Sequence, residues 1–174
     1  MTDDRPVTTF RILSEREYQM TRVFAAPRDL VYQAYTDPAH IPHWWGPREV
    51  TTVVDVMDVR PGGAWRFIQH HADGSQFAFR GEYREVAPPE RLVYTFGAEF
   101  TYPGMPRQEV LEALTFEEHD GTTLLIARWS FQSVQDRDGL INSGAEGGMR
   151  ESWDRLAAHL ANIVPTTGNA AVNP

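Results

Sequence analysis

The sequence contains no cysteine and no lysine, and both absences limit the chemistry open to the protein. Without cysteine there is no disulfide, no thiolate nucleophile and no sulfur-ligated zinc site. All 16 basic residues are arginine, so Schiff-base chemistry on a lysine and a P-loop lysine are excluded as well. No serine lies in a GXSXG motif, which argues against a serine hydrolase with a nucleophile elbow.

Long apolar runs and positive charge are also scarce. No run reaches the roughly 18 apolar residues of a membrane span, and the opening MTDDRPVTTF lacks the basic and apolar regions of a signal peptide. We therefore expect a cytoplasmic protein without a membrane span. The net charge of −8 disfavours phosphate backbones as partners, so nucleic acid is not an expected partner.

The length of the chain, 174 residues, suits one domain with a substantial core. We expect an N-terminal arm over residues 1–14, a domain over 15–163 and a disordered tail over 164–174. The alternation of apolar and polar residues in this segment indicates, as an alternative to an arm, an extra edge strand. An exposed edge of this kind could pair two copies into a homodimer.

Two periodicities alternate along the domain. Residues 15–24 alternate as in a strand, 27–37 show helical spacing, and a second short helix is expected over 38–44. Strand-like alternation with short turns then continues over 50–130, with an Asp-Gly hairpin turn at 120–121. These segments predict an antiparallel sheet of about six or seven strands.

The last predicted element is one long helix over 136–163. Its apolar residues recur every three or four positions and form a single stripe, which would cover the apolar face of the sheet. Gly144, Gly147 and Gly148 interrupt it, and each weakens a helix by about 1 kcal/mol relative to alanine. We therefore expect a close approach of this helix to the sheet or to a ligand.

Five segments, taken in order, carry a resemblance to a known family: RVFAAPRDLVYQAYTDPAHIPHWWGP, DVRPGGAWRF, FRGEYREVAPPERLVYTF, LTFEEHDGTTL and SGAEGGMRESWDRLAAHL. Over residues 15–163 the chain resembles the START-like, or SRPBCC, superfamily, in its bacterial branch named after the activator of the heat-shock-protein-90 ATPase. The resemblance implies an α+β helix-grip fold, as in START domains and the birch-pollen allergen. In that fold a curved antiparallel sheet, with two short helices after the first strand, grips a long C-terminal helix over an apolar cavity.

The resemblance also implies a choice of functions. Relatives bind lipids, sterols, polyketides and other apolar small molecules, some are cyclases or hydrolases, and some bind the chaperone. We therefore expect an apolar small-molecule ligand, with an enzyme and a chaperone ATPase co-regulator as alternatives. The chaperone role is the weaker of these, because the chain lacks the separate N-terminal domain of eukaryotic activators.

Aromatic and aliphatic residues on the sheet and helix faces form the candidate ligand site. A solid core would use the same residues, and the resemblance favours a hollow one. Trp45 follows a second tryptophan, so the pair either pins the short helix onto the sheet or forms a lip of the pocket. The candidate lining residues are Trp45, Trp65, Phe67, Phe79, Tyr83, Tyr94, Leu114, Phe116, Trp129, Met149, Trp153 and Leu156.

Glu112 is the most informative charged residue. It shares strand parity with Leu114 and Phe116, so its carboxylate is expected to point into the apolar chamber. A carboxylate buried there is a candidate ligand anchor or general acid/base. Pairing with an arginine, or a place at the wet rim, is the alternative.

Histidines do not predict a metal site. His40 and His43 lie three residues apart on a short helix, but no third ligand is apparent and HEXXH spacing is absent. His70 and His71 are adjacent, so on a strand they point to opposite faces. We expect neither a metal nor a cofactor.

Overall fold

Eight antiparallel strands form a single sheet in the computed structural model, which describes residues 6–101 and 104–165. The strands are β1 (Thr9–Ser14), β2 (Glu17–Phe24), β3 (Val50–Met57), β4 (Ala64–His71), β5 (Gln76–Ala87), β6 (Arg91–Ala98), β7 (Val110–His119) and β8 (Thr122–Ser130). The helices are α1 (Arg28–Thr36), α2 (Ile41–Trp44), α3 (Val134–Asn142) and α4 (Ala145–Ile163). The α+β helix-grip prediction is confirmed, with eight strands in place of six or seven.

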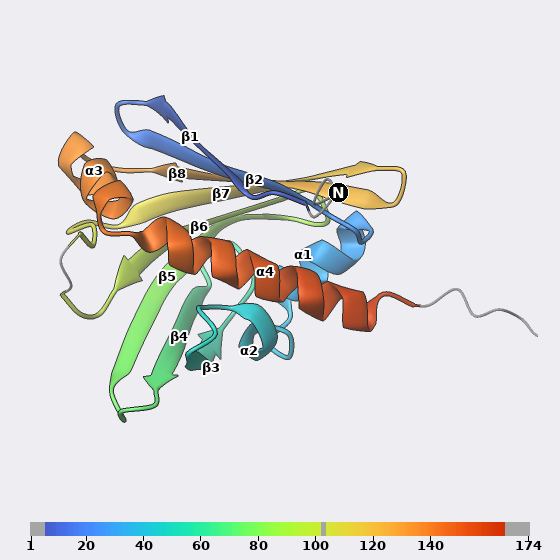
Figure 1. Ribbon diagram of the computed structural model, residues 1–174, viewed down its shortest axis with the longest axis horizontal. Coiled ribbons are helices and arrows are strands. Elements are labelled where there is room, and N and C mark those ends of the chain that lie inside the picture. Colours follow the sequence, from blue (N-terminus) through green and yellow to red (C-terminus); the bar gives the residue numbers. More distant parts are fainter. Residues whose placement is uncertain (1–5, 102–103, 166–174) are drawn as a thin grey trace, which may run out of the picture.

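The strand order is β1-β2-β8-β7-β6-β5-β4-β3. Strands β3 to β8 follow one another as a meander, which the short turns of the sequence predict. The helices α1 and α2 carry the chain from β2 to β3, at the opposite edge of the sheet. The sheet curves around α4, which lies across its open side, while α3 lies near one end of α4 and α1 and α2 pack toward the other (Figure 1).

The extra strand is β1, which pairs with β2 from Thr9 to Ser14. The segment predicted as an arm is therefore an edge strand of the same sheet over these residues. Its Ile12 side chain is 54 % exposed, and pairing of two copies along this edge stays a prediction. Residues 1–5 of the predicted arm and 166–174 of the predicted tail lie outside the described residues.

The predicted terminal helix over 136–163 is wrong in one respect, because the structure divides it into α3 and α4. Gly144 lies between them with a φ of +80°, a left-handed conformation that glycine adopts without strain. The two later glycines, Gly147 and Gly148, lie inside α4. A Cβ atom built on either would meet nothing within 4 Å, so close approach to the sheet does not explain them.

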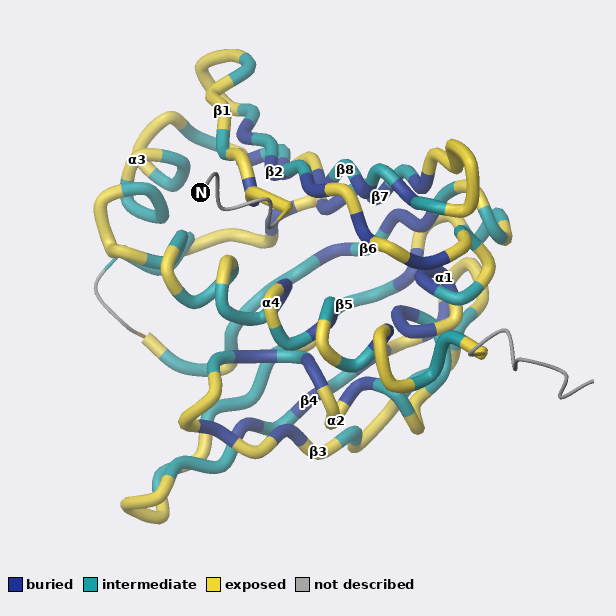
Figure 2. The backbone as a smooth tube through the Cα atoms, turned by 45° about the vertical axis from the view of Figure 1, so that its right-hand side comes forward, coloured by how far each residue is buried: buried dark blue, intermediate teal, exposed yellow. Residues whose placement is uncertain are grey.

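Polar contacts hold α4 against β2 and α1. Arg22 of β2 is only 7 % exposed and forms an ion pair with Asp154 of α4. The Trp153 indole N–H donates a hydrogen bond of 2.8 Å to the hydroxyl of Tyr35 on α1. Burial is concentrated along the middle of the strands and on the inner faces of α1 and α4, whereas hairpin ends and α3 are more exposed (Figure 2).

The second short helix is shorter than predicted, because residues 38–40 form a turn and α2 begins at Ile41. Trp44 is 2 % exposed and its indole N–H donates to the Ala34 carbonyl of α1 at 3.0 Å. This bond and the packing of its ring on Tyr35 pin α2 against α1. Within the described residues, no helix is long and apolar enough to cross a membrane.

Candidate ligand-binding cavity

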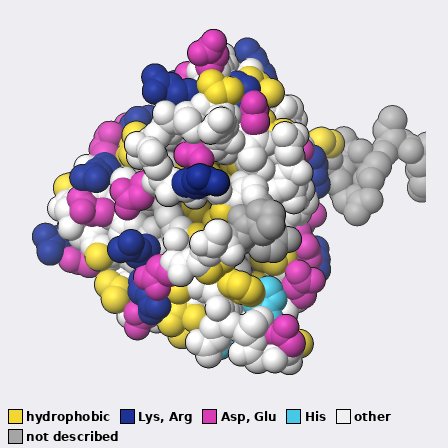
Figure 3. Space-filling model, turned by 90° about the vertical axis from the view of Figure 1, so that its left-hand side faces the viewer, with side chains coloured by type: hydrophobic (Ala, Val, Ile, Leu, Met, Phe, Trp, Pro, Cys, Tyr) yellow, Lys and Arg dark blue, Asp and Glu magenta, His cyan; other side chains and the backbone are white. Residues whose placement is uncertain are grey.

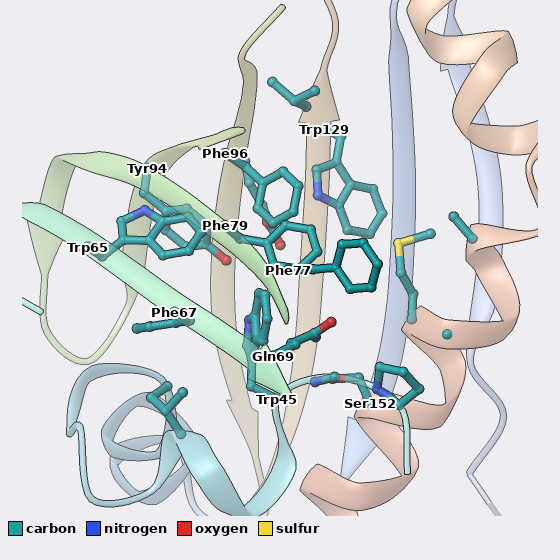
Figure 4. Close-up of a pocket in the computed structure, with 18 of the residues that line it drawn as sticks. Trp45, Trp65, Phe67, Gln69, Phe77, Phe79, Tyr94, Phe96, Trp129 and Ser152 are labelled. Atoms are coloured by element: carbon teal, nitrogen blue, oxygen red, sulfur yellow. The ribbon is translucent and has the colours of Figure 1, made fainter. Parts of the chain in front are cut away.

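A cavity of about 490 Å³ lies between the curved sheet and α4. This volume is within the roughly 300–1,000 Å³ of small-molecule sites. In Figure 4, aromatic side chains of β4, β5 and β6 project into the interior toward Trp129 of β8, with Trp45 below them and Ser152 on the side of α4. The interior is therefore hollow in its middle and mostly aromatic.

Most of the predicted site residues line this cavity. They come from the end of α2, from five neighbouring strands and from α4, which the fold brings around one space. The predicted residues that line the cavity are Trp45, Trp65, Phe67, Phe79, Tyr83, Tyr94, Glu112, Trp129, Met149 and Trp153.

Leu114, Phe116 and Leu156 do not line the cavity and belong to the packed core. Phe116 lies on the predicted face of β7, but α1 covers that part of the strand and the ring packs edge-on against Tyr32 and Tyr35. Leu114 and Leu156 are fully buried at 0 % exposure. Strand parity identifies the face of the sheet, whereas the position of α1 decides which part of that face is filled.

Other lining residues were not predicted as site residues. Gln69 and Phe77 share strand parity with predicted neighbours, as does Phe96, so the same alternation could have found them. Phe100, Met105 and Pro106 come from the loop before β7, where no periodicity marks an inward direction. Further lining residues are Met20, Tyr35, Ile41, Trp44, Gly46, Pro47, His71, Val110, Leu140, Ala145, Gly148 and Ser152.

The cavity differs in exposure along its length. Trp65 and Trp153 are 3 % and 2 % exposed, whereas Phe77, Phe100 and Met149 are only partly buried. Figure 3 shows hydrophobic side chains gathered on the face of the molecule that carries α3 and the β4–β5 hairpin. We place the entrance on this face.

The two adjacent tryptophans have different places. Trp44 anchors α2 in the core, as described above, and its neighbour Trp45 is partly exposed and lines the cavity. The Trp45 ring meets Phe67 and Phe79 edge-on, with centroids 5.3 and 5.2 Å away. Trp44 therefore anchors α2 on α1, where the sequence suggested the sheet, and both tryptophans contribute to the cavity wall; a lip formed by Trp45 stays a prediction.

A glycine in β5 positions Trp65. The Trp65 indole N–H donates to the Thr95 carbonyl of β6 at 3.1 Å and reaches it by crossing Gly81 of the intervening strand. A Cβ atom on Gly81 would lie 1.7 Å from the Thr95 oxygen and 2.4 Å from the Trp65 nitrogen. Only glycine leaves room for this bond.

Glu112 lies in a row of opposed side chains across four strands. The register pairs Tyr83 with Tyr94, Tyr94 with Glu112, and Glu112 with Trp129. Directly opposed residues of antiparallel strands point to the same face, and all four line the cavity. Glu112 is 9 % exposed, and no described arginine forms an ion pair with it, so neither the rim nor an arginine partner applies.

Burial raises the pKa of the Glu112 carboxyl from its ordinary 4.5 to about 7, because the charged form loses its hydration. Hydrogen bonds from Trp129 and Tyr94 partly oppose this change. Burial, with the nearby Glu112 carboxylate, raises the pKa of Tyr94 and of Tyr35 well above the usual value. Both phenols therefore stay protonated at neutral pH, where Glu112 populates both of its forms.

The structure brings His159 of α4 against the predicted histidine pair on α2. His40 Nδ1 lies 2.8 Å from His159 Nε2, and the His43 and His159 rings stack at 4.7 Å. Desolvation and the two neighbouring histidines lower the pKa of His159. No group of three or more ligating side chains among the described residues could hold a metal ion.

The curved sheet, the gripped helix and the cavity between them define a helix-grip protein of the SRPBCC class. Residues 25–161 match the family model described as "Activator of Hsp90 ATPase homolog 1-like protein". The chain belongs to this family. A search of the curated proteins finds no match.

Solved structures of bacterial proteins share the fold. A Rhodobacter sphaeroides protein has a TM-score of 0.83 at 23 % identity, over 90 % of this chain and 99 % of its own. Protein Ms6760 from Mycobacterium smegmatis has a TM-score of 0.77 at 25 % identity, over 93 % and 100 %. CalU16 from Micromonospora echinospora is similar with a TM-score of 0.57 at 22 % identity, over 90 % and 85 %.

Proposed function

We propose that this protein binds an apolar small molecule, a lipid, polyketide or aromatic metabolite, inside the cavity between the sheet and α4. The observation that carries the proposal is the cavity itself, about 490 Å³ of space with a mainly aromatic wall. Burial of an apolar ligand there would be favourable by roughly 25 cal/mol for each Å² removed from water. Glu112 and Tyr94 supply polar groups that orient the ligand.

Gly148 supports the same proposal, because it lines the cavity on α4 and has open space where a side chain would project. Alanine there would strengthen the helix by about 1 kcal/mol, so local stability does not favour glycine. The open space at Gly148 leaves room for a ligand beside the helix. The expected approach of this helix to a ligand, and not to the sheet, is thus the interpretation we retain.

A fluorescence titration with the neutral apolar dye N-phenyl-1-naphthylamine tests this function. The wild-type protein should enhance the dye emission in a saturable manner, with one dye bound per chain. Gly148→Leu should weaken saturable binding, because its side chain takes up part of the space that the dye would occupy. Gly147→Leu is the matched control, since Gly147 lies on the exposed side of the same helix turn and does not line the cavity. Equal binding by both variants would contradict the proposal.

A second candidate function is acid/base catalysis by Glu112, as in a cyclase or hydrolase. It is favoured by the pKa of about 7, which lets this carboxyl accept or donate a proton near neutral pH. The test is mass spectrometry of a bound ligand after incubation with wild-type protein or with Glu112→Gln. An altered ligand with the wild-type protein alone supports catalysis, and identical spectra refute it. The chaperone role rests on the family name and stays a prediction.

A further inference from the structure

The cavity carries a carboxyl group without a positively charged partner. Glu112 is the one acidic side chain among the described lining residues, and no arginine is among them. The arginines of the two strands beside β7 pair elsewhere: Arg128 of β8 forms an ion pair with Glu17, and Arg91 of β6 with Glu85. An unpaired carboxylate in an apolar site is costly, because its charge is neither hydrated nor neutralised.

The Glu112 carboxylate also has unused acceptor capacity. Two oxygens offer about four lone-pair sites. Trp129 and Tyr94, directly opposite Glu112 on the two neighbouring strands, are its nearest polar neighbours and lower its pKa only in part. The remaining sites face the cavity, where a ligand that donates hydrogen bonds would satisfy them.

The aromatic wall also favours a positively charged ligand. The rings of Trp45, Trp65 and Phe79 cluster around the cavity, with Trp45 6.4 Å from Trp65 and 5.2 Å from Phe79 between centroids. The face of an aromatic ring is negative and attracts a cation, most strongly away from water. A carboxylate among aromatic rings selects against an anionic ligand.

We propose that the ligand is an apolar amine, whose protonated nitrogen binds Glu112 and whose ring-containing body lies among the aromatic side chains. This inference rests on the proposed binding function and names its ligand class. An ammonium–carboxylate pair removes the unpaired charge and adds charge-assisted hydrogen bonds, which are about twice as strong as neutral ones.

The pairing makes binding depend on pH. Burial raises the pKa of Glu112 to about 7, and an alkyl amine stays protonated up to about pH 9 or 10. Affinity for an amine should therefore rise between about pH 5.5 and 8.5, as Glu112 ionises. The titratable groups around it are Tyr83 of β5, Tyr94 of β6 and Tyr35 of α1, with His71 of β4 elsewhere on the wall.

Three ligands that share a naphthalene ring and differ in the charge of the attached group test this ligand class: 1-naphthylmethylamine, 1-naphthalenemethanol and 1-naphthoic acid. Calorimetric titration of the wild-type protein at about pH 8 should give at least about tenfold tighter binding for the amine than for the alcohol, and the weakest binding for the acid. Glu112→Gln should reduce the preference for the amine to about twofold or less while alcohol binding is retained. Glu117→Gln, an exposed carboxyl on the same strand, is the control and should keep the wild-type order.

The outcomes distinguish this inference from the function on which it rests. Binding of all three ligands with similar affinity, or tightest binding of the acid, overturns the amine proposal and leaves the binding cavity in place. An amine preference that survives in Glu112→Gln also overturns it. Failure of all three ligands and of the neutral dye to bind overturns both proposals.

Discussion

Replacement of Glu112 by glutamine should stabilise the folded protein at alkaline pH. A carboxyl whose pKa is raised on folding contributes stability below its unfolded pKa and loses it as pH rises through the folded value. The difference between 4.5 and about 7 corresponds to about 3 kcal/mol once pH is well above 7, at about 1.4 kcal/mol for each pH unit. Glutamine fills the same space without charge, and its amide oxygen can still accept from Trp129.

The assay is urea unfolding, followed by tryptophan fluorescence at about pH 5, 7 and 9. Water entering the cavity weakens the effect, so we expect Glu112→Gln to gain about 1–3 kcal/mol over wild type at pH 9 and less than about 1 kcal/mol at pH 5. For a domain of this size the gain is a rise of roughly 3–9 °C in Tm. Glu117→Gln, exposed on the same strand, should follow the wild-type curve. Parallel curves for wild type and Glu112→Gln at every pH would refute the burial of this charge.

Two further predictions concern the framework around the cavity. Gly81→Ala should destabilise the fold by about 2 kcal/mol or more in the same unfolding assay, because its Cβ would collide with the Thr95 carbonyl oxygen. Unchanged stability would contradict the close approach of the Thr95 carbonyl and the Trp65 indole over Gly81. His159→Gln should lose less Tm than wild type as pH falls from about 7.5 to 5.5, since the pKa of His159 is lowered on folding and its protonation favours the unfolded chain. An equal loss would show that burial of His159 beside His40 and His43 does not lower its pKa.

Much of the candidate site could be predicted from strand alternation. Trp65 and Phe67 alternate along β4, and Tyr94 follows the same rule on β6, so parity alone placed them on one face. Glu112 was found in the same way, because a charged residue interrupts an apolar row. The raised pKa of Glu112 could not be predicted, because it depends on how deeply the folded chain buries the carboxyl, and a local sequence pattern does not show this.

The rest depended on contacts between segments far apart in the sequence. The closure of α1 over Phe116 fills part of the predicted chamber, and this packing is set by where the helix lands on the sheet. His159 meets His40 only through the crossing of α4 with α2, so spacing along the chain could not reveal the cluster. The division of the last helix at Gly144 reflects a backbone conformation that periodicity alone does not show.

The central claim is that an apolar molecule enters the space between the sheet and α4. It is tested most directly by two-dimensional NMR of protein carrying ¹⁵N-labelled tryptophan, titrated with N-phenyl-1-naphthylamine. The chain has five tryptophans, and all of them line the cavity. We expect saturable movement of the indole signals, largest for Trp45 and Trp129, and weaker saturation at the same dye concentrations in Gly148→Leu. Saturable dye binding that leaves every indole signal unmoved would contradict it.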